Sequence, residues 1–255
     1  MDKLNISIIR ISQLKDNYSY LIKDHKSKNA VIIDPAESEK IIKILTDEKM
    51  NLTAILLTHH HTDHVAGVSA LLKFKIVPVY SPSNKIKETT HIVEDNSVID
   101  LSFIKMSVIS TPGHTLDHVV YYNKHNKLLF SGDTLFRLGC GRVFEGTFDS
   151  MHQSLQKINT LEDETIVYCG HEYTKNNLNF LESIFSNNFQ LQIAKDKINK
   201  QLKLTNSSVP FNLGSEKQIN PFLSSNNEFY QKFKNTKKFT DLQMFCFLRE
   251  LKDKF

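Results

Sequence analysis

The sequence contains few cysteines and no long apolar run. Its three cysteines, Cys140, Cys169 and Cys246, are far apart and form no CxxC pair. This pattern argues against a disulfide framework and a cysteine zinc site, and it is typical of a reducing, cytoplasmic compartment. No stretch approaches the roughly 18 apolar residues of a membrane span, and Arg10 interrupts the apolar start. We therefore expect no membrane association and no targeting segment.

Internal repeats and low-complexity tracts are also absent, which excludes solenoids and long flexible linkers. The 255 residues are 40% hydrophobic and 24% charged. These values are ordinary for globular proteins. The chain is long enough to form one large domain, or a main domain with a smaller partner.

The net charge of +4 is unevenly distributed along the chain. From Thr174 onward, 13 Lys or Arg stand against 7 Asp or Glu, whereas the preceding part has 19 against 21. A basic excess of this size fits a solvated surface, an anionic substrate or a nucleic acid, and charge alone does not separate them.

Short apolar runs predict strands in the first two-thirds of the chain. We expect strands at 4–11, 17–23, 30–34, 52–58, 76–80, 103–109, 118–123, 127–131 and 165–169. Helical spacing of apolar residues predicts helices at 37–49 and 64–73. The interpretation is an α/β layer.

The pattern changes after Tyr173. Segments 174–185, 191–202 and 239–255 are predicted to be helical, and a polar loop containing Pro210, Gly214 and Pro221 lies between them. We therefore place an α/β domain at 1–173 and a smaller helical domain at 174–255.

The motif HHHTDH at 59–64 places four histidines and an aspartate directly after an apolar run. If residues 55–59 form a strand, alternation points His59 and His61 to one side and His60 to the other. With Asp63 and His64, four side chains are then available to Zn²⁺, Fe or Mn. The alternative is a His-rich surface loop.

Three later segments repeat one context, in which a candidate ligand follows a predicted strand. They are STPGHT with His114, LLFSGDTLF with Asp133 and IVYCGHEYT with His171. Each alone is equally consistent with a buried polar group or a turn cap. Together they predict a metal centre at one edge of the α/β layer.

These motifs resemble the metallo-β-lactamase superfamily, whose signature is THxHxDH followed by single His, Asp and His ligands. Within it, SGDTLFRLGCGRVFEGT (131–147), GHEYT (170–174), NPF (220–222) and RELKDKF (249–255) resemble the hydroxyacylglutathione hydrolases, or glyoxalase II enzymes. The resemblance extends over essentially the whole chain.

The resemblance implies a four-layer αββα sandwich with a smaller C-terminal helical domain and two divalent metal ions. Zn is expected, with Fe or Mn as alternatives. One ion would be held by His59, His61 and His114, the other by Asp63, His64 and His171, and Asp133 would bridge them. Asp63 and Asp133 are thus the expected catalytic carboxylates.

The resemblance further implies an enzyme, a thioester hydrolase in which a metal-bridging hydroxide cleaves S-D-lactoylglutathione to glutathione and a 2-hydroxy acid. This reaction belongs to methylglyoxal detoxification. The partner is then a small molecule rather than a nucleic acid or membrane, and a cytoplasmic monomer is expected. Substrate-binding positions carried over from the family are Arg142, Phe144, Tyr173, Arg249 and Lys252.

Two positions depart from the family pattern. Phe144 stands where a Tyr is common, and Ser224 follows NPFL where an Arg is common. Of the other histidines, His118 is expected to support a ligand, and His60 and His152 to have surface or packing roles. Alternative functions are a mononuclear iron persulfide dioxygenase, an RNA-processing metallo-phosphodiesterase, and a regulatory module without catalysis.

Overall fold

The structure, a computed structural model that describes residues 5–223 and 227–255, divides into two units. Unit 1 runs to Ser110 and also includes Asp117–Asn126. Unit 2 contains Thr111–Leu116 and Lys127–Phe255. The short segment around His114 therefore belongs with the C-terminal part of the chain, although its neighbours in sequence belong to unit 1.

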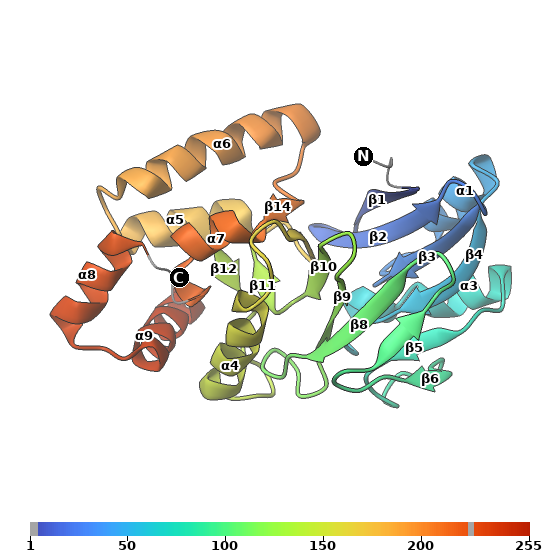
Figure 1. The fold of residues 1–255 in the computed structure, drawn as a ribbon, viewed down its shortest axis with the longest axis horizontal. Coiled ribbons are helices and arrows are strands. Elements are labelled where there is room, and N and C mark those ends of the chain that lie inside the picture. The colour runs from blue at the N-terminus through green and yellow to red at the C-terminus, as the bar shows by residue number, and fades with distance from the viewer. Residues whose placement is uncertain (1–4, 224–226) are drawn as a thin grey trace. The chain divides into compact units, whose positions relative to one another are not determined.

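Unit 1 is built on a sheet with strand order β1-β2-β3-β4-β5-β6 (Figure 1). The strands are Ile6–Gln13, Asn17–Asp24, Asn29–Ile33, Asn51–Leu56, Val79–Ser81 and His91–Ile92. The first three pair antiparallel, and β3 to β6 pair parallel. A separate antiparallel group consists of β7 (Val98–Asp100), β8 (Lys105–Ser110) and β9 (Val119–Asn123).

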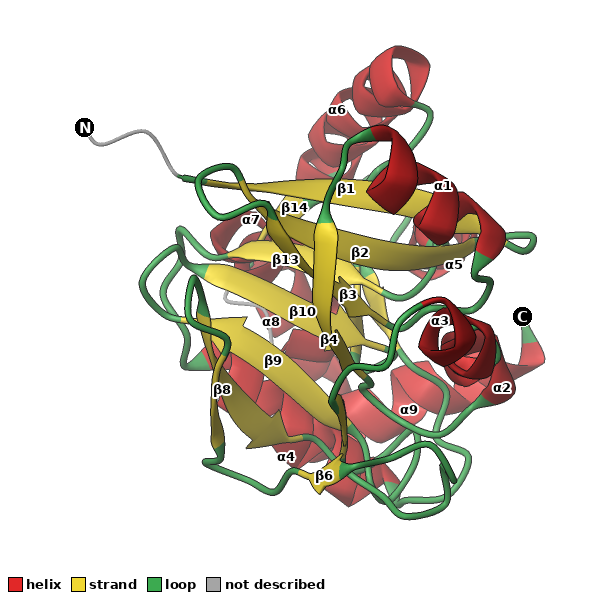
Figure 2. Ribbon diagram, turned by 90° about the vertical axis from the view of Figure 1, so that its right-hand side faces the viewer, coloured by secondary structure: helices red, strands yellow, loops and turns green. Residues whose placement is uncertain are grey.

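Helices α1 (Glu39–Asp47) and α3 (Val68–Phe74) cover one face of the first sheet (Figure 2). Their apolar side chains share one buried core with the strands, which includes Leu21, Ile32, Ile41, Leu45, Ile55, Val68 and Leu71. The short helix α2 (Thr62–Val65) precedes α3. Burial of this apolar stripe, rather than intrinsic propensity, stabilises such short helices.

Unit 2 contains the parallel pair β10 (Leu128–Gly132) and β13 (Ile166–Cys169), with β14 (Phe211–Asn212) antiparallel to β13. A hairpin is formed by β11 (Leu135–Phe136) and β12 (Gly139–Cys140). The helices are α4 (Phe148–Asn159), α5 (Thr174–Ile184), α6 (Phe189–Thr205), α7 (Leu213–Ile219), the 3₁₀ turn η1 (Pro221–Leu223), α8 (Glu228–Lys237) and α9 (Asp241–Lys254).

Local capping fixes where several of these helices begin and end. Thr147 and Ser150 form a capping box at the start of α4, and Thr240 and Gln243 form another at the start of α9. Helix α6 ends at Asn206, which adopts the left-handed conformation that Asn tolerates. The caps satisfy backbone groups that have no partner within the helix.

The predicted strands are found within a few residues of their expected positions, and the predicted terminal helices are confirmed as α5, α6 and α9. Three expectations were wrong. The helix predicted at 64–73 is interrupted at Gly67, whose N–H donates to the Pro35 carbonyl. The polar loop expected around Gly214 contains helix α7, and both α4 and α8 lie in segments for which no helix was predicted.

Gly67 has a steric reason for being glycine. A Cβ at this position would lie 2.7 Å from the Pro35 carbonyl oxygen. The start of α3 therefore packs directly against the backbone that follows β3, and any larger residue would push the two segments apart.

In the part of the chain that the structure describes, no helix is both long enough and apolar enough to cross a bilayer. All three cysteines are free; Cys140 and Cys169 are buried, and Cys246 is partly exposed. Burial raises the pKa of each of the three thiols.

Candidate metal centre

Unit 1 carries four of the predicted ligands on one loop, and we call His59, His61, Asp63 and His64 the loop set. Strand β4 ends at Leu56, so the motif does not begin on a strand. We expected alternation along a strand to point His59 and His61 to one side and His60 to the other. That reason is wrong, because the three histidines do not lie on a strand. Helix α2 begins at Thr62 and places Asp63 and His64 in its only turn.

The loop set is nevertheless compact. The ring centroid of His59 lies 4.7 Å from that of His61 and 4.3 Å from that of His64. The His64 Nε2 lies 3.9 Å from an Asp63 carboxylate oxygen. His60 contacts a different partner, since its Nδ1 lies 2.9 Å from the Asp117 carboxylate. The His59 and His61 rings thus lie close together, and a loop rather than a strand arranges them.

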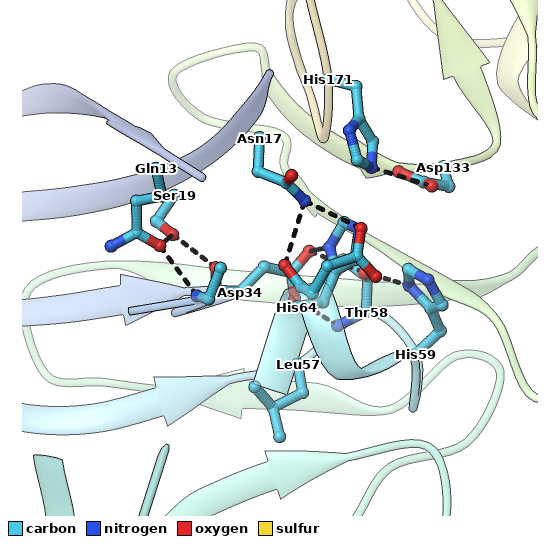
Figure 3. A network of polar contacts seen from close by, with 12 residues as sticks. Gln13, Asn17, Ser19, Asp34, Leu57, Thr58, His59, His64, Asp133 and His171 are labelled. Carbon is cyan, nitrogen blue, oxygen red and sulfur yellow. Dashed lines mark hydrogen bonds and ion pairs between the residues drawn. The ribbon is translucent and has the colours of Figure 1, made fainter. Parts of the chain in front are cut away.

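Asp34, directly after β3, contacts Thr58 and His64 (Figure 3). One carboxylate oxygen accepts the Thr58 N–H at 2.8 Å. The other accepts the Thr58 hydroxyl at 2.7 Å and lies 3.1 Å from the His64 Nδ1. Asp34 is buried and has a φ of 49°, a conformation that Asp tolerates better than most residues.

These contacts fix which nitrogen of each ring carries the proton. The carboxylate of Asp34 only accepts, so His64 donates through Nδ1. The Thr58 hydroxyl uses its single hydrogen on Asp34, so its oxygen accepts from the His59 Nδ1 at 3.0 Å. In both neutral rings the Nε2 lone pair is then left for another ligand, which is the arrangement found in metal-binding histidines.

Two further residues support the loop set. The Asn17 amide donates to the Asp63 carboxylate at 2.9 Å and to the Asp63 carbonyl at 3.1 Å. His118 is fully buried and stacks on His59, with ring centroids 4.9 Å apart. This position fits the supporting role predicted for His118.

Unit 2 carries the other three predicted ligands, and we call His114, Asp133 and His171 the strand-end set. A bulge in the β10–β13 pairing occurs between Phe130 and Gly132, and Gly132 has a φ of 46°, which favours glycine. The Gly132 carbonyl accepts the Gly170 N–H at 2.9 Å. The bulge therefore ends both strands together, and Asp133 and His171 follow immediately.

The strand-end set converges on one carboxylate oxygen. The Oδ2 of Asp133 lies 3.4 Å from the His114 Nε2 and 3.3 Å from the His171 Nε2, and Figure 3 shows the second of these contacts. All three side chains are buried. The Nδ1 of His114 lies 2.8 Å from the Arg142 carbonyl oxygen, which only accepts.

This geometry fits a bound cation. Because His114 donates through Nδ1, its neutral ring presents a lone pair at Nε2 toward the carboxylate of Asp133. A cation between this nitrogen and the carboxylate would satisfy both groups in the buried site. Imidazole nitrogens and carboxylates are also the donors that Zn²⁺, Fe and Mn accept, so both sets have metal-ligand chemistry.

The five predicted substrate-binding residues all lie in unit 2. Tyr173 stacks on the His171 ring at 4.7 Å, and Phe144 lies edge-on to the His114 ring at 5.2 Å. Both rings are partly exposed, with 37% of Tyr173 and 59% of Phe144 accessible. These aromatic side chains flank two of the strand-end ligands. Ser224 lies outside the described residues.

The three cations form a second group. The carboxylate of Asp253 contacts Arg142 at 3.2 Å and Arg249 at 2.9 Å. Arg249 is buried and also donates to the Cys140 carbonyl at 3.1 Å, so part of its role is structural. The Lys252 ammonium contacts the Asn176 backbone and side chain. Two of the three cations thus share one side-chain carboxylate, and Lys252 contacts a neutral residue, so the group as a whole favours anions.

The pKa of Lys252 is lowered to about 8. Burial of the ammonium group is the largest cause, and the positive charges of Arg249 and Arg142 add to it. Lys252 therefore changes its charge close to neutral pH.

Sequence reasoning missed Asp34, Asn17, Thr58 and Asp117. A signal existed for Asp34, because it follows an apolar strand in the run AVIID, the same context that identified Asp133. Asn17 and Asp117 are brought in by chain folding, and no local pattern marks them. His152 has a packing role as predicted, with its ring 5.6 Å from that of Phe245.

Comparison with known proteins shows which family the chain belongs to. Residues 14–171 match the model of the metallo-β-lactamase superfamily, and residues 172–255 match the model of the hydroxyacylglutathione hydrolase C-terminus. The chain belongs to the hydroxyacylglutathione hydrolase family. The hydroxyacylglutathione hydrolase of Psychromonas ingrahamii is 40% identical over 98% of this chain and 99% of its own length. That of Hamiltonella defensa is 42% identical over 97% and 99%.

Solved structures agree on the fold. The crystal structure of the BLEG-1 B3 metallo-β-lactamase matches with a TM-score of 0.66 and 25% identity, over 86% of this chain and 99% of that one. ETHE1 from Myxococcus xanthus matches with a TM-score of 0.66 and 23% identity, over 94% and 95%. The predicted metallo-β-lactamase fold with a helical C-terminal region is confirmed. The predicted boundary between residues 173 and 174 stays a prediction, close to where the two family matches meet.

Proposed function

We propose that this hydroxyacylglutathione hydrolase family member is a thioester hydrolase that cleaves S-(2-hydroxyacyl)glutathione, with S-D-lactoylglutathione as its substrate. The observation that carries the proposal is the extent of the family match. Relatives named hydroxyacylglutathione hydrolase are about 40% identical along nearly their full length, and the C-terminal region has its own family match.

The proposed metal ligands are the loop set and the strand-end set together. His59, His61 and His114 would hold one ion, Asp63, His64 and His171 the other, and Asp133 would contribute to both. The Nδ1 contacts of His59, His64 and His114 support this assignment, because a neutral ring that donates through Nδ1 has its lone pair on Nε2. Zinc is the proposed metal, and the same donors accept Fe and Mn.

Bound divalent ions would supply a Lewis acid and lower the pKa of a nearby water. The residues of this chain hold that chemistry in place. Asp34 and Thr58 fix the His59 and His64 rings, and the Arg142 carbonyl fixes His114. The leaving thiolate has a conjugate acid with a reference pKa of about 8.5, so little help is required from a general acid.

Substrate recognition is proposed for the cations and aromatic rings of unit 2. Glutathione carries two carboxylates, and Arg142, Arg249 and Lys252 supply guanidinium and ammonium donors for them. Tyr173 and Phe144 would contact the substrate beside the strand-end ligands. The missing hydroxyl at Phe144 predicts a thiol or acyl preference different from that of relatives with Tyr at this position.

The family match does not favour a persulfide dioxygenase or an RNA-processing phosphodiesterase. We propose a monomer in a reducing, cytoplasmic compartment, a setting that three free cysteines fit.

Hydrolysis of S-D-lactoylglutathione by the purified protein, with metal analysis of the same sample, tests the proposal. We expect thioester cleavage and close to two divalent ions per chain. A protein that carries one iron, oxidises glutathione persulfide and leaves the thioester intact would overturn it.

A further inference from the structure

The β11–β12 hairpin lies between two parts of the strand-end set in the sequence. Asp133 precedes β11, and Arg142, whose carbonyl accepts from the His114 Nδ1, follows β12. The hairpin itself provides none of the proposed ligands. Its position nevertheless determines where two of them lie.

Gly141, just after the hairpin, packs directly against the backbone of Asp133. A Cβ at residue 141 would lie 1.8 Å from the Asp133 carbonyl oxygen, so only glycine fits here. The Gly141 N–H also donates to the Thr134 carbonyl at 3.1 Å. The chain that leaves the hairpin is thus in direct contact with the backbone of Asp133, and one cannot shift without the other.

Side chains from the helices hold the hairpin turn through its backbone. The Leu138 N–H donates to the Glu216 carboxylate at 2.7 Å, and the Arg137 carbonyl accepts the Asn177 amide at 3.0 Å. The Asn220 amide donates to Glu216, Phe136 and Gly139, and Arg249 donates to Cys140. Helices α5, α7 and α9 therefore each contribute to one clamp.

Glu216 is the charged centre of this clamp and is 1% exposed. The residue it holds, Leu138, has a φ of 59°, a conformation unfavourable for a residue with a branched side chain. Such a conformation persists only where surrounding contacts maintain it. The buried Glu216 carboxylate, which accepts the Leu138 N–H and the Asn220 amide, is a contact that maintains this conformation.

We propose that Glu216 is a positioning residue of the hydrolase: through Leu138 it fixes the β11–β12 hairpin, and through the hairpin it sets the positions of Asp133 and of the carbonyl that orients His114. This inference rests on the proposed function. It assigns the C-terminal helices a task besides substrate binding, because they hold the hairpin whose ends adjoin Asp133 and the Arg142 carbonyl.

Glu216→Ala and Glu216→Gln separate positioning from bulk stability. Gln keeps an oxygen that accepts from Leu138, so Glu216→Gln should retain wild-type hairpin protection and turnover. In Glu216→Ala we expect amide hydrogen exchange of residues 135–141 to accelerate at least roughly tenfold. We expect kcat to fall about 10- to 100-fold, KM to change little, and metal content to drop.

Asn177→Ala and Glu182→Ala complete the test. Asn177→Ala removes a neighbouring bond to the same turn and should act in the same direction, and it decides the question if Glu216→Ala does not fold. Glu182 pairs with Lys195 elsewhere in the helices. Glu182→Ala should lower the melting temperature without changing hairpin exchange or kcat.

A folded Glu216→Ala or Asn177→Ala protein with wild-type hairpin exchange, or with fast exchange and full kcat, would overturn the positioning role. A wild-type protein that binds no metal and cleaves no thioester would instead overturn the proposed function, and hairpin exchange would still be measurable in it.

Discussion

The loop set and the strand-end set supply the same kinds of ligand by different means. The loop set takes four proposed ligands from residues 59–64, and side chains hold it: Asp34 and Thr58 fix two rings, and Asn17 holds Asp63. The strand-end set takes three ligands from positions between 114 and 171, and backbone groups place it: a bulge at Gly132, the Arg142 carbonyl and the Gly141 contact.

The two kinds of support predict that different substitutions will displace the ligands of each set. A ligand loop held by side chains can be disturbed by removing one carboxylate, whereas ligands placed by backbone geometry change only when the supporting segments move. Removing one supporting side chain in unit 1 should therefore affect mainly metal affinity, whereas perturbing the helices of unit 2 should change stability, metal content and turnover together.

The largest effect is expected at Asp133, where three buried side chains of the strand-end set meet. Asp133→Ala should empty both proposed metal positions and cost at least about 4 kcal/mol of transition-state stabilisation, roughly 10³-fold in kcat/KM. His60→Ala is the control and should keep its metal, since His60 contacts Asp117. Metal content is measured by mass spectrometry. Equal metal loss in the two variants would mean that Asp133 is no more a metal ligand than His60 is.

The next effect concerns the pH dependence of stability in unit 2. Burial raises the pKa of Glu216 to about 7, from an ordinary value of 4.5. The charged group Arg137 and the phenol of Tyr230 face it. The folded state therefore holds this proton more tightly than the unfolded state, and stability falls as pH rises from about 4.5 to about 7.

Glu216→Gln removes this titration. Relative to the wild type, its free energy of unfolding should improve by up to about 3 kcal/mol across that interval and then stay level. Urea unfolding at several pH values checks this. A constant difference between the two proteins at every pH would mean that Glu216 titrates normally.

Asp34→Ala tests whether side chains hold the loop set in unit 1. Loss of the carboxylate frees the His64 ring and the Thr58 hydroxyl, and metal affinity should fall about 10- to 100-fold. Asp24 is a matched control, because it is also buried in unit 1 and accepts backbone N–H groups in its own turn. Asp24→Asn should lower stability but not metal affinity, and titration with a competing chelator distinguishes the two outcomes.

The smallest effect is expected at Lys252. Lys252→Ala should raise KM by about 1.5 kcal/mol, roughly tenfold, with kcat unchanged, because a charge-assisted bond to substrate is lost equally in ground and transition states. With a pKa lowered to about 8, the wild-type ammonium loses its charge above that pH. Wild-type KM should therefore rise there, and the variant's should not. Arg249→Ala should also reduce kcat, because Arg249 holds the Cys140 carbonyl.

Sequence reasoning identified the ligands better than their supports. His114, Asp133 and His171 each follow an apolar run, so local context was enough to predict that they lie together, which the structure shows. The clamp around Glu216 was not, since Asn177, Glu216 and Asn220 are ordinary polar residues whose partners are backbone groups about 40 to 80 positions away. The helix at Gly214 was missed because glycine and proline signals outweighed a short apolar pattern that only tertiary packing stabilises.

The burial of the cysteines acquires a meaning once the proposed product is considered. An enzyme that hydrolyses glutathione thioesters releases a thiol at every turnover. Thiolates exchange with disulfides at rates that depend on their ionisation and on how accessible the sulfur atoms are. Cys140 and Cys169 are buried, and burial raises the pKa of both thiols, so neither presents a reactive thiolate. The interior next to Arg249 is thereby protected from mixed disulfides with the released thiol.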